Sequence, residues 1–98
     1  MSRTVVVRYR TSPEAAGENR RLVEQVYAGL AADDPGGLRY ATLLLTDGVT
    51  FIHIAEIEGT DNPLDRSTAF AEFQKGIAER CTEPPSPSEA TIVGSYGL

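Results

Sequence analysis

The fold of this 98-residue chain is decided by the stretch LRYATLLLTDGVTFIHIAEI, residues 38–57. Two apolar runs, 38–46 and 49–57, flank the dipeptide Asp47-Gly48. Runs rich in β-branched and aromatic residues are typical of strands, and Asp-Gly supplies the positive φ of a tight hairpin turn at little cost. The stretch therefore predicts two antiparallel strands joined by a hairpin.

Upstream of the hairpin, the sequence predicts a strand followed by a helix. Residues 4–11 are rich in β-branched side chains and alternate in polarity towards their end, as a strand does. The pair Ser12-Pro13 is a helix-start signal, and apolar residues recur at helical spacing after it. The breaker cluster Asp-Asp-Pro-Gly-Gly at 33–37 ends the pattern, so we expect a helix over 13–32.

Downstream of the hairpin, the sequence predicts a second helix and a last strand. Apolar residues from Ala69 to Cys81 fall on one helical stripe, which predicts a helix over 67–80. The proline-rich segment 84–87 cannot continue that helix. The last apolar run, 90–96, predicts a closing strand.

The order strand, helix, strand, strand, helix, strand predicts a ferredoxin-like α+β fold, as one domain over residues 1–98. Right-handed crossovers place the first and third strands at the centre of a four-stranded antiparallel sheet, and both helices then lie on one face. The other face is also apolar, because Ala41, Leu43, Ile52 and Ile54 fall on the side opposite His53. Ile92 and Val93 are expected to extend this pattern in the last strand. Since large exposed apolar patches are rare, the sequence predicts a homodimer packed sheet against sheet.

Charge and composition exclude several classes of partner and site. Fourteen acidic against nine basic residues give a net charge of −5, the wrong sign for binding nucleic acid. One cysteine and one histidine supply neither an internal disulfide nor a zinc ligand set, so no metal site is expected. No apolar stretch approaches the length of a membrane span or a signal-peptide core, and we expect a cytoplasmic protein with no membrane partner.

Four segments resemble the dimeric α+β barrel superfamily, in particular small proteins similar to antibiotic biosynthesis monooxygenases. They are TFIHI at 50–54, NPL at 62–64, AFAEFQ at 69–74 and IVGSY at 92–96. The superfamily includes cofactor-independent oxygenases of polyketide-type aromatics, haem-degrading enzymes and muconolactone isomerases. The haem-degrading members use an Asn, a Trp and a His, whereas this chain has no Trp. The resemblance implies a cavity between helices and sheet or within the dimeric barrel, with no cofactor.

His53 is the candidate catalytic residue. It is the only histidine and lies between two isoleucines in the predicted third strand, where a partly buried imidazole would act as a general base or bind a phenolic ligand. The alternative is a structural histidine whose hydrogen bonds are satisfied by neighbouring groups. The candidate ligand-binding residues, all expected near His53, are Arg8, Tyr40, Thr42 and Phe51. Arg8 pairing with Glu56, and Tyr40 serving as an interface anchor, are the alternatives for those two residues.

Three functions remain open from the sequence. The first is a cofactor-independent monooxygenase acting on a small aromatic or polyketide-like molecule, with His53 as base or hydrogen-bonding group. The second is a non-catalytic dimeric barrel that binds a small ligand or has a structural role. The third, a muconolactone-type isomerase, requires an acid/base pair that would have to come from Glu56 and His53.

Overall fold

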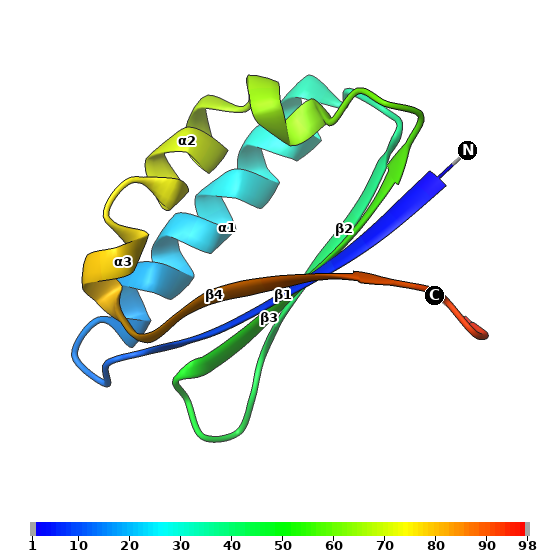
Figure 1. The fold of residues 1–98 in the computed structure, drawn as a ribbon. Coiled ribbons are helices and arrows are strands. Elements are labelled where there is room, and N and C mark those ends of the chain that lie inside the picture. Colours follow the sequence, from blue (N-terminus) through cyan, green and yellow to red (C-terminus); the bar gives the residue numbers. More distant parts are fainter. Residues whose placement is uncertain (1, 98) are drawn as a thin grey trace.

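The computed structural model describes residues 2–97 and contains one antiparallel sheet with helices on one face (Figure 1). The strands are β1 (Ser2–Thr11), β2 (Leu38–Leu44), β3 (Thr50–Glu58) and β4 (Cys81–Ala90). The helices are α1 (Ala16–Asp33), the 3₁₀ helix η1 (Pro63–Arg66), α2 (Thr68–Gln74) and α3 (Ile77–Arg80). The strand order is β2-β3-β1-β4, with every neighbouring pair antiparallel. The predicted ferredoxin-like fold with β1 and β3 at its centre is therefore confirmed.

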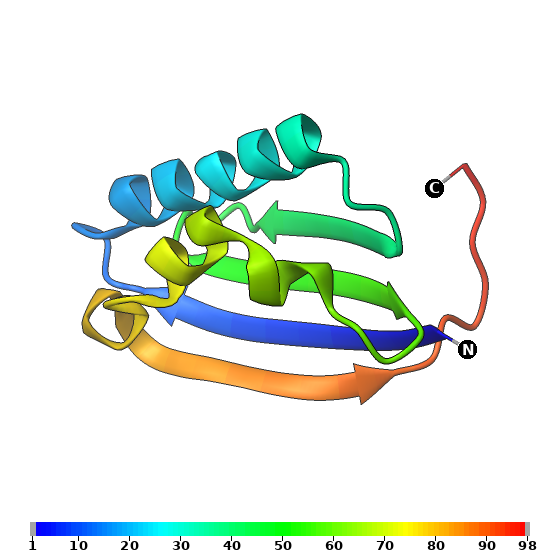
Figure 2. The same ribbon diagram turned by 90° about the horizontal axis from the view of Figure 1, so that it is seen from above.

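The helix layer covers the sheet unevenly. Helix α1 runs along the β2 side and α2 lies over the centre, whereas the C-terminal half of β4 has no helix over it (Figure 2). Two helices are too narrow to cover four strands.

The hydrophobic core forms where α1 and α2 meet the central strands. The rings of Tyr9 and Phe51 stack at a centroid distance of 5.4 Å, and both side chains are 1% exposed. Val23 and Val26 of α1 and Phe73 of α2 close the cluster from above. This packing sets the distance between the helices and strands β1 and β3. It therefore positions the side chains that lie between the two layers.

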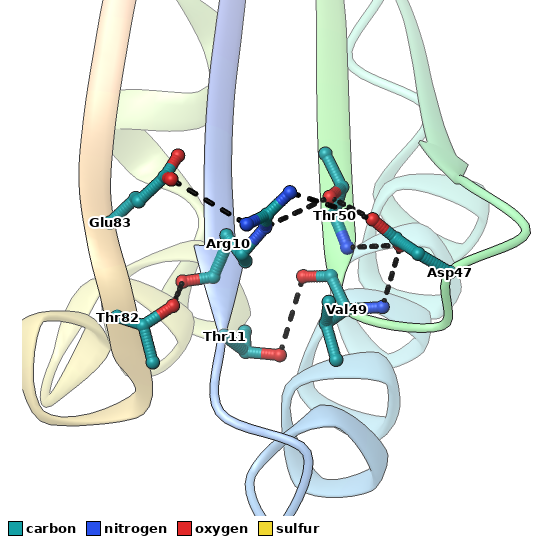
Figure 3. A network of polar contacts seen from close by, with 7 residues as sticks. All are labelled: Arg10, Thr11, Asp47, Val49, Thr50, Thr82 and Glu83. Carbon is teal, nitrogen blue, oxygen red and sulfur yellow. Dashed lines mark hydrogen bonds and ion pairs between the residues drawn. The ribbon is translucent and has the colours of Figure 1, made fainter.

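A polar network ties the β2–β3 hairpin to the end of the sheet (Figure 3). Gly48 has a φ of 78°, and the carboxylate of Asp47 accepts from the backbone N–H groups of Val49 and Thr50 at 2.9 Å each. The Arg10 guanidinium lies 3.9 Å from that carboxylate and 3.6 Å from Glu83 of β4. The hairpin predicted at Asp47-Gly48 is confirmed, and the network holds its register against β1.

The face of the sheet away from the helices is apolar in β2 and β3. Leu43 is 47% exposed, Ala41 is exposed, and Ile52 and Ile54 are partly exposed on this face. We refer to Ala41, Leu43, Ile52 and Ile54 as the outer apolar face. Its presence confirms that the hairpin strands are apolar on both sides.

The position of the last strand is a correction. Strand β4 begins at Cys81, directly after α3, and contains the prolines that were expected to precede it. Proline has no backbone N–H, but β4 is an edge strand, so the position without a donor can face the side that has no neighbouring strand. The register of β4 against β1 also shifts between Arg8 and Arg10, as at a β-bulge. The run 90–96 contributes only Ala90 to the strand, and Val93 is 98% exposed beyond it. Ile92 and Val93 therefore do not extend the apolar pattern of the sheet.

The second helix is also interrupted. Instead of one helix over 67–80, α2 ends at Gln74 and α3 starts at Ile77. Gly76 between them has a φ of 77°, a left-handed conformation that glycine adopts without steric cost. The break turns the chain so that Arg80, at the end of α3, points back under α2.

Candidate functional site

A cavity of about 560 Å³ lies between the helix layer and the strands β1 and β3. Its walls are mostly apolar and aromatic, and a few polar side chains lie among them. The lining residues are Arg3, Val5, Val7, Tyr9, Tyr40, His53, Ala55, Ile57, Asn62, Leu64, Phe70, Phe73, Gln74, Ile77 and Pro85. A concave, apolar space of this size with few polar groups is typical of a small-molecule site.

His53 faces this cavity from β3 and is 5% exposed. Its Nε2 atom lies 2.8 Å from the hydroxyl of Tyr9 on the neighbouring strand β1. Its Nδ1 atom lies 2.6 Å from the hydroxyl of Tyr40 and 3.1 Å from Oγ1 of Thr42, both on β2. Both ring nitrogens are thus engaged by side chains from the two flanking strands.

The row of hydrogen bonds continues on both sides of the imidazole. The Asn19 amide of α1 donates to the Tyr9 oxygen at 2.8 Å, and Nε of Arg80 donates to Oδ1 of Asn19 at 3.0 Å. At the other end, the hydroxyl of Tyr27 lies 2.8 Å from Oγ1 of Thr42. Within residues 2–97, no buried side-chain nitrogen or oxygen lacks a partner.

The directions of these hydrogen bonds follow from the Arg80 end. A guanidinium only donates, so Oδ1 of Asn19 accepts and the amide nitrogen of Asn19 points at Tyr9. The Tyr9 oxygen accepts that hydrogen bond, and we infer that its own proton goes to Nε2 of His53. A neutral imidazole then carries its proton on Nδ1 and donates it to Tyr40. The proton of the Tyr40 hydroxyl can then go to the hydroxyl of Thr42, with which Tyr40 also hydrogen-bonds, or to a group in the cavity.

Burial sets the protonation states of the row. It lowers the pKa of His53 to about 4, so the imidazole is neutral at pH 7. It also raises the pKa values of Tyr9 and Tyr40 above the ordinary tyrosine value, so both phenols stay protonated. The cavity therefore presents a neutral hydrogen-bond donor, Tyr40, rather than a charged group at this end.

The structure brings together only part of the site expected from the sequence. Tyr40 and Thr42 both contact His53, as expected. Phe51 shares the face of His53 but is buried against Tyr9 in the core and does not line the cavity. The expectation that Arg8 shares this face is wrong. Val7, not Arg8, is the register partner of His53, and a shift of one residue along a strand points the side chain to the other face.

Four residues of the row, Tyr9, Asn19, Tyr27 and Arg80, were missed. Asn19 could have been found, because it precedes Val23 and Val26 at the i, i+4 and i+7 positions of the buried face of α1. Tyr9 lies on the inward face of β1 with Val5 and Val7. The role of Arg80 depends on the break at Gly76, for which the sequence pattern gave no signal.

Glu56 and His53 do not form an acid/base pair. Glu56 neighbours Ala55, so it points to the opposite face, where its carboxylate lies 3.5 Å from Arg39. This removes the residue pair that an isomerase would use. Within residues 2–97, no group of three or more His, Cys, Asp or Glu side chains could hold a metal ion, and no helix is long and apolar enough to cross a membrane.

Comparison with known proteins identifies the fold. No protein-family model matches the chain, and no curated protein matches it. Among solved structures, Rv0793 from Mycobacterium tuberculosis superimposes with a TM-score of 0.75 at 18% identity, covering 97% of this chain and 98% of that one. A candidate antibiotic biosynthesis monooxygenase from Nitrosomonas europaea gives a TM-score of 0.76 at 10% identity, covering 94% and 90%.

A variant of SnoaB, a cofactor-independent oxygenase from Streptomyces nogalater, gives a TM-score of 0.66 at 18% identity, covering 99% of this chain and 98% of that one. These neighbours confirm the resemblance to the antibiotic biosynthesis monooxygenase-like proteins at the level of the fold. Their sequence identities to this chain, 10–18%, are too low to transfer an activity.

Proposed function

We propose that this protein binds a small aromatic molecule in the cavity beneath α2 and oxidises it with dioxygen without a cofactor. The observation that carries the proposal is the row Tyr9–His53–Tyr40, which brings the Tyr40 hydroxyl to the wall of an apolar cavity. The shared fold with SnoaB, which is named a cofactor-independent oxygenase, supports the choice of chemistry.

Tyr40 is the proposed catalytic residue, and His53 is its positioning residue. Because Nδ1 of His53 donates to the Tyr40 oxygen, the Tyr40 proton is directed towards the ligand and the hydroxyl becomes a better donor. A phenol or enol bound there would lose its proton more readily, since the donor stabilises the resulting oxyanion in a site of low dielectric. Solvent water accepts the proton, because burial lowers the pKa of His53 to about 4 and makes the imidazole a weak base.

In the proposed reaction, the electrons that reduce dioxygen come from the substrate. The oxyanion is an enolate whose negative charge is shared with the carbon that was the CH₂ group, and this carbon bonds to one atom of dioxygen to give a peroxide that takes up a proton from water. The peroxide then loses water, and the CH₂ group becomes a carbonyl. The overall change is CH₂ plus O₂ to C=O plus H₂O, in which the carbon is oxidised and dioxygen is reduced. The protein has to bind, orient and exclude water, which the apolar walls favour.

Turnover of anthrone to anthraquinone tests this function, because anthrone has an ionisable tautomer and a reactive CH₂ group. The Tyr40→Phe variant should lose about 100-fold in kcat/KM, the usual effect of removing one oxyanion donor. His53→Ala should lose activity in the same direction. Tyr96→Phe is the matched control, because Tyr96 is 95% exposed and touches no part of the row. Unchanged turnover in both Tyr40→Phe and His53→Ala would show that the row has no catalytic role.

Ligand binding without catalysis is the second candidate function. It is favoured by one observation: both ring nitrogens of His53 are already engaged, so the imidazole has no free lone pair for a substrate proton. In that case the wild-type protein would bind anthrone or a naphthol without consuming oxygen, and Tyr40→Phe would weaken binding only. Measuring binding and oxygen uptake on the same samples separates the two functions.

We also propose that the functional unit is a homodimer joined through the outer apolar face. Ala41, Leu43, Ile52 and Ile54 form a contiguous patch on two paired central and edge strands, and no helix of this chain covers it. A second copy would present the same patch, and an isologous sheet-to-sheet contact is the simplest cover.

Light scattering coupled to size exclusion tests the dimer. Wild-type protein should elute with the mass of two chains, and Ile54→Glu should shift it towards one chain, because a carboxylate would be buried at the contact. Gln25→Glu adds the same charge on the exposed surface of α1 and should leave the mass unchanged. A monomeric wild-type protein would refute the proposed assembly but not the cavity.

A further inference from the structure

The cavity beneath α2 has a second polar end, at Arg3. Among the described residues, Arg3 is the only one in the lining with a charged side chain; it is exposed and lies at the N-terminal end of β1 on the same face as Val5 and Val7. Its register partner is Ile57, whereas Val7 pairs with His53. Four residues of strand therefore separate the two polar ends by about 13 Å.

Arg3 has no carboxylate partner within residues 2–97. Two acids near this end of the sheet have other partners: Asp61 is paired with Arg66, and Glu56 with Arg39. Glu89 lies opposite Val5 on β4 and shares a neighbouring hollow with Arg3, but it does not line the cavity, and the two side chains do not form an ion pair. The guanidinium is consequently an unpaired cation beside an apolar space in a protein whose net charge is −5.

A guanidinium prefers a planar anion that it can bind through two parallel hydrogen bonds, and a carboxylate fits that geometry. At the other end, the Tyr40 hydroxyl donates to a ligand oxygen. Between the two ends, Phe70 and Phe73 provide aromatic walls on which a flat ring packs well. The three features together describe an elongated aromatic acid.

We propose that the ligand is an aromatic carboxylate whose acid group binds Arg3 and whose phenolic or carbonyl oxygen accepts from Tyr40. This inference rests on the proposed ligand-binding cavity and specifies the class of ligand it takes. Arg3 is then the specificity-determining residue, because it selects an anion over the neutral analogue, while Tyr40 orients the reacting end. The stem of Arg3 is flexible enough to bring the guanidinium towards a two-ring ligand.

The test compares two probes that differ only at the acid end, 6-hydroxy-2-naphthoate and 6-hydroxy-2-naphthamide, whose substituents lie at opposite ends of the ring system. Calorimetry on wild-type protein should show the naphthoate binding about 10-fold more tightly or better, as one charge-assisted contact provides. Arg3→Gln should abolish this preference and leave the affinity for the naphthamide unchanged. Arg20→Gln removes the same charge from the exposed face of α1 and should keep the preference.

The results separate this inference from the proposed function. If both probes bind equally and shift the NMR signals of the His53 ring, the cavity binds aromatics but Arg3 does not select an acid, and the inference is wrong. If Arg3→Gln and wild type show the same preference for the naphthoate, the inference is also wrong. If neither probe binds, both the inference and the proposed ligand-binding cavity are refuted.

Discussion

The Nδ1 atom of His53 lies 2.6 Å from the hydroxyl of Tyr40, while its Nε2 atom lies 2.8 Å from the hydroxyl of Tyr9. The imidazole thus connects a tyrosine of the core to a tyrosine at the cavity wall. Asn19 donates to the core tyrosine, and from this we infer that the protons of the row point towards Tyr40. This arrangement makes Tyr40 a donor to whatever binds in the cavity.

The first prediction concerns the tautomer of His53. Long-range ¹H–¹⁵N correlation spectra at pH 7 should show a neutral ring with the proton on Nδ1 and a bare Nε2. The reason is that the Tyr9 proton already occupies the Nε2 lone pair. A spectrum with the proton on Nε2 would reverse the row and contradict the proposed role of Tyr40.

The second prediction concerns stability against pH. His53 has a pKa of about 4 in the folded state and an ordinary value of 6.5 when unfolded. Below pH 6.5 the unfolded chain therefore binds a proton that the folded chain does not, and stability falls as the pH drops towards 4. Urea unfolding should lose about 2 kcal/mol of free energy between pH 7 and pH 5.

There is no other histidine in the chain, so His53→Gln should flatten this dependence between pH 7 and pH 5 even if the variant is less stable. An equal slope in His53→Gln and wild type would mean that His53 is not buried in its neutral form.

The third prediction concerns Tyr9. Tyr9→Phe keeps the ring that stacks on Phe51 but removes the hydroxyl between Asn19 and His53. Two buried polar groups lose a partner, so the free energy of unfolding should fall by about 1–3 kcal/mol. Tyr96→Phe, at an exposed site, should change it by less than about 0.5 kcal/mol. Equal stabilities for the two variants, measured by urea denaturation, would show that the row contributes nothing to folding.

The fourth prediction concerns the hairpin. Hydrogen bonds from Thr50 and from the backbone of Val49 lower the pKa of Asp47 to about 2 from its ordinary value of 3.8. The Asp47 carboxylate therefore stabilises the fold above pH 3.8, and this contribution is lost as the pH falls to 2. Asp47→Ala should lower the melting temperature at pH 7 and leave ligand affinity unchanged, because the turn lies outside the cavity lining. A melting temperature equal to that of wild type would contradict the role of the turn network.

The sequence was sufficient to predict the fold because the hairpin and the order of elements depend on local signals. Asp47-Gly48 marks the turn, and the apolar periods distinguish helix from strand on both sides of it. The last strand was misplaced because it was assigned to the apolar run 90–96, whereas β4 is a mostly polar edge strand that tolerates proline.

The site was predicted only in part, for two physical reasons. Tyr40 and Thr42 follow from the pairing of β2 with β3, which the hairpin specifies. Arg8 was assigned to the wrong face because the pairing of β1 with β3 has no turn to set its register. Arg80 and Asn19 are 61 residues apart, and nothing in the local sequence pattern indicates that they meet.

The most direct test of the central claim is an NMR titration with 2-naphthol, a neutral phenol that requires only the Tyr40 end of the cavity. Signals of the His53 ring should shift with saturable binding in wild type, and Tyr40→Phe should bind at least about 10-fold more weakly. The account would be contradicted if the His53 signals stay fixed while the methyl signals of Leu43 and Ile54, on the outer apolar face, move instead.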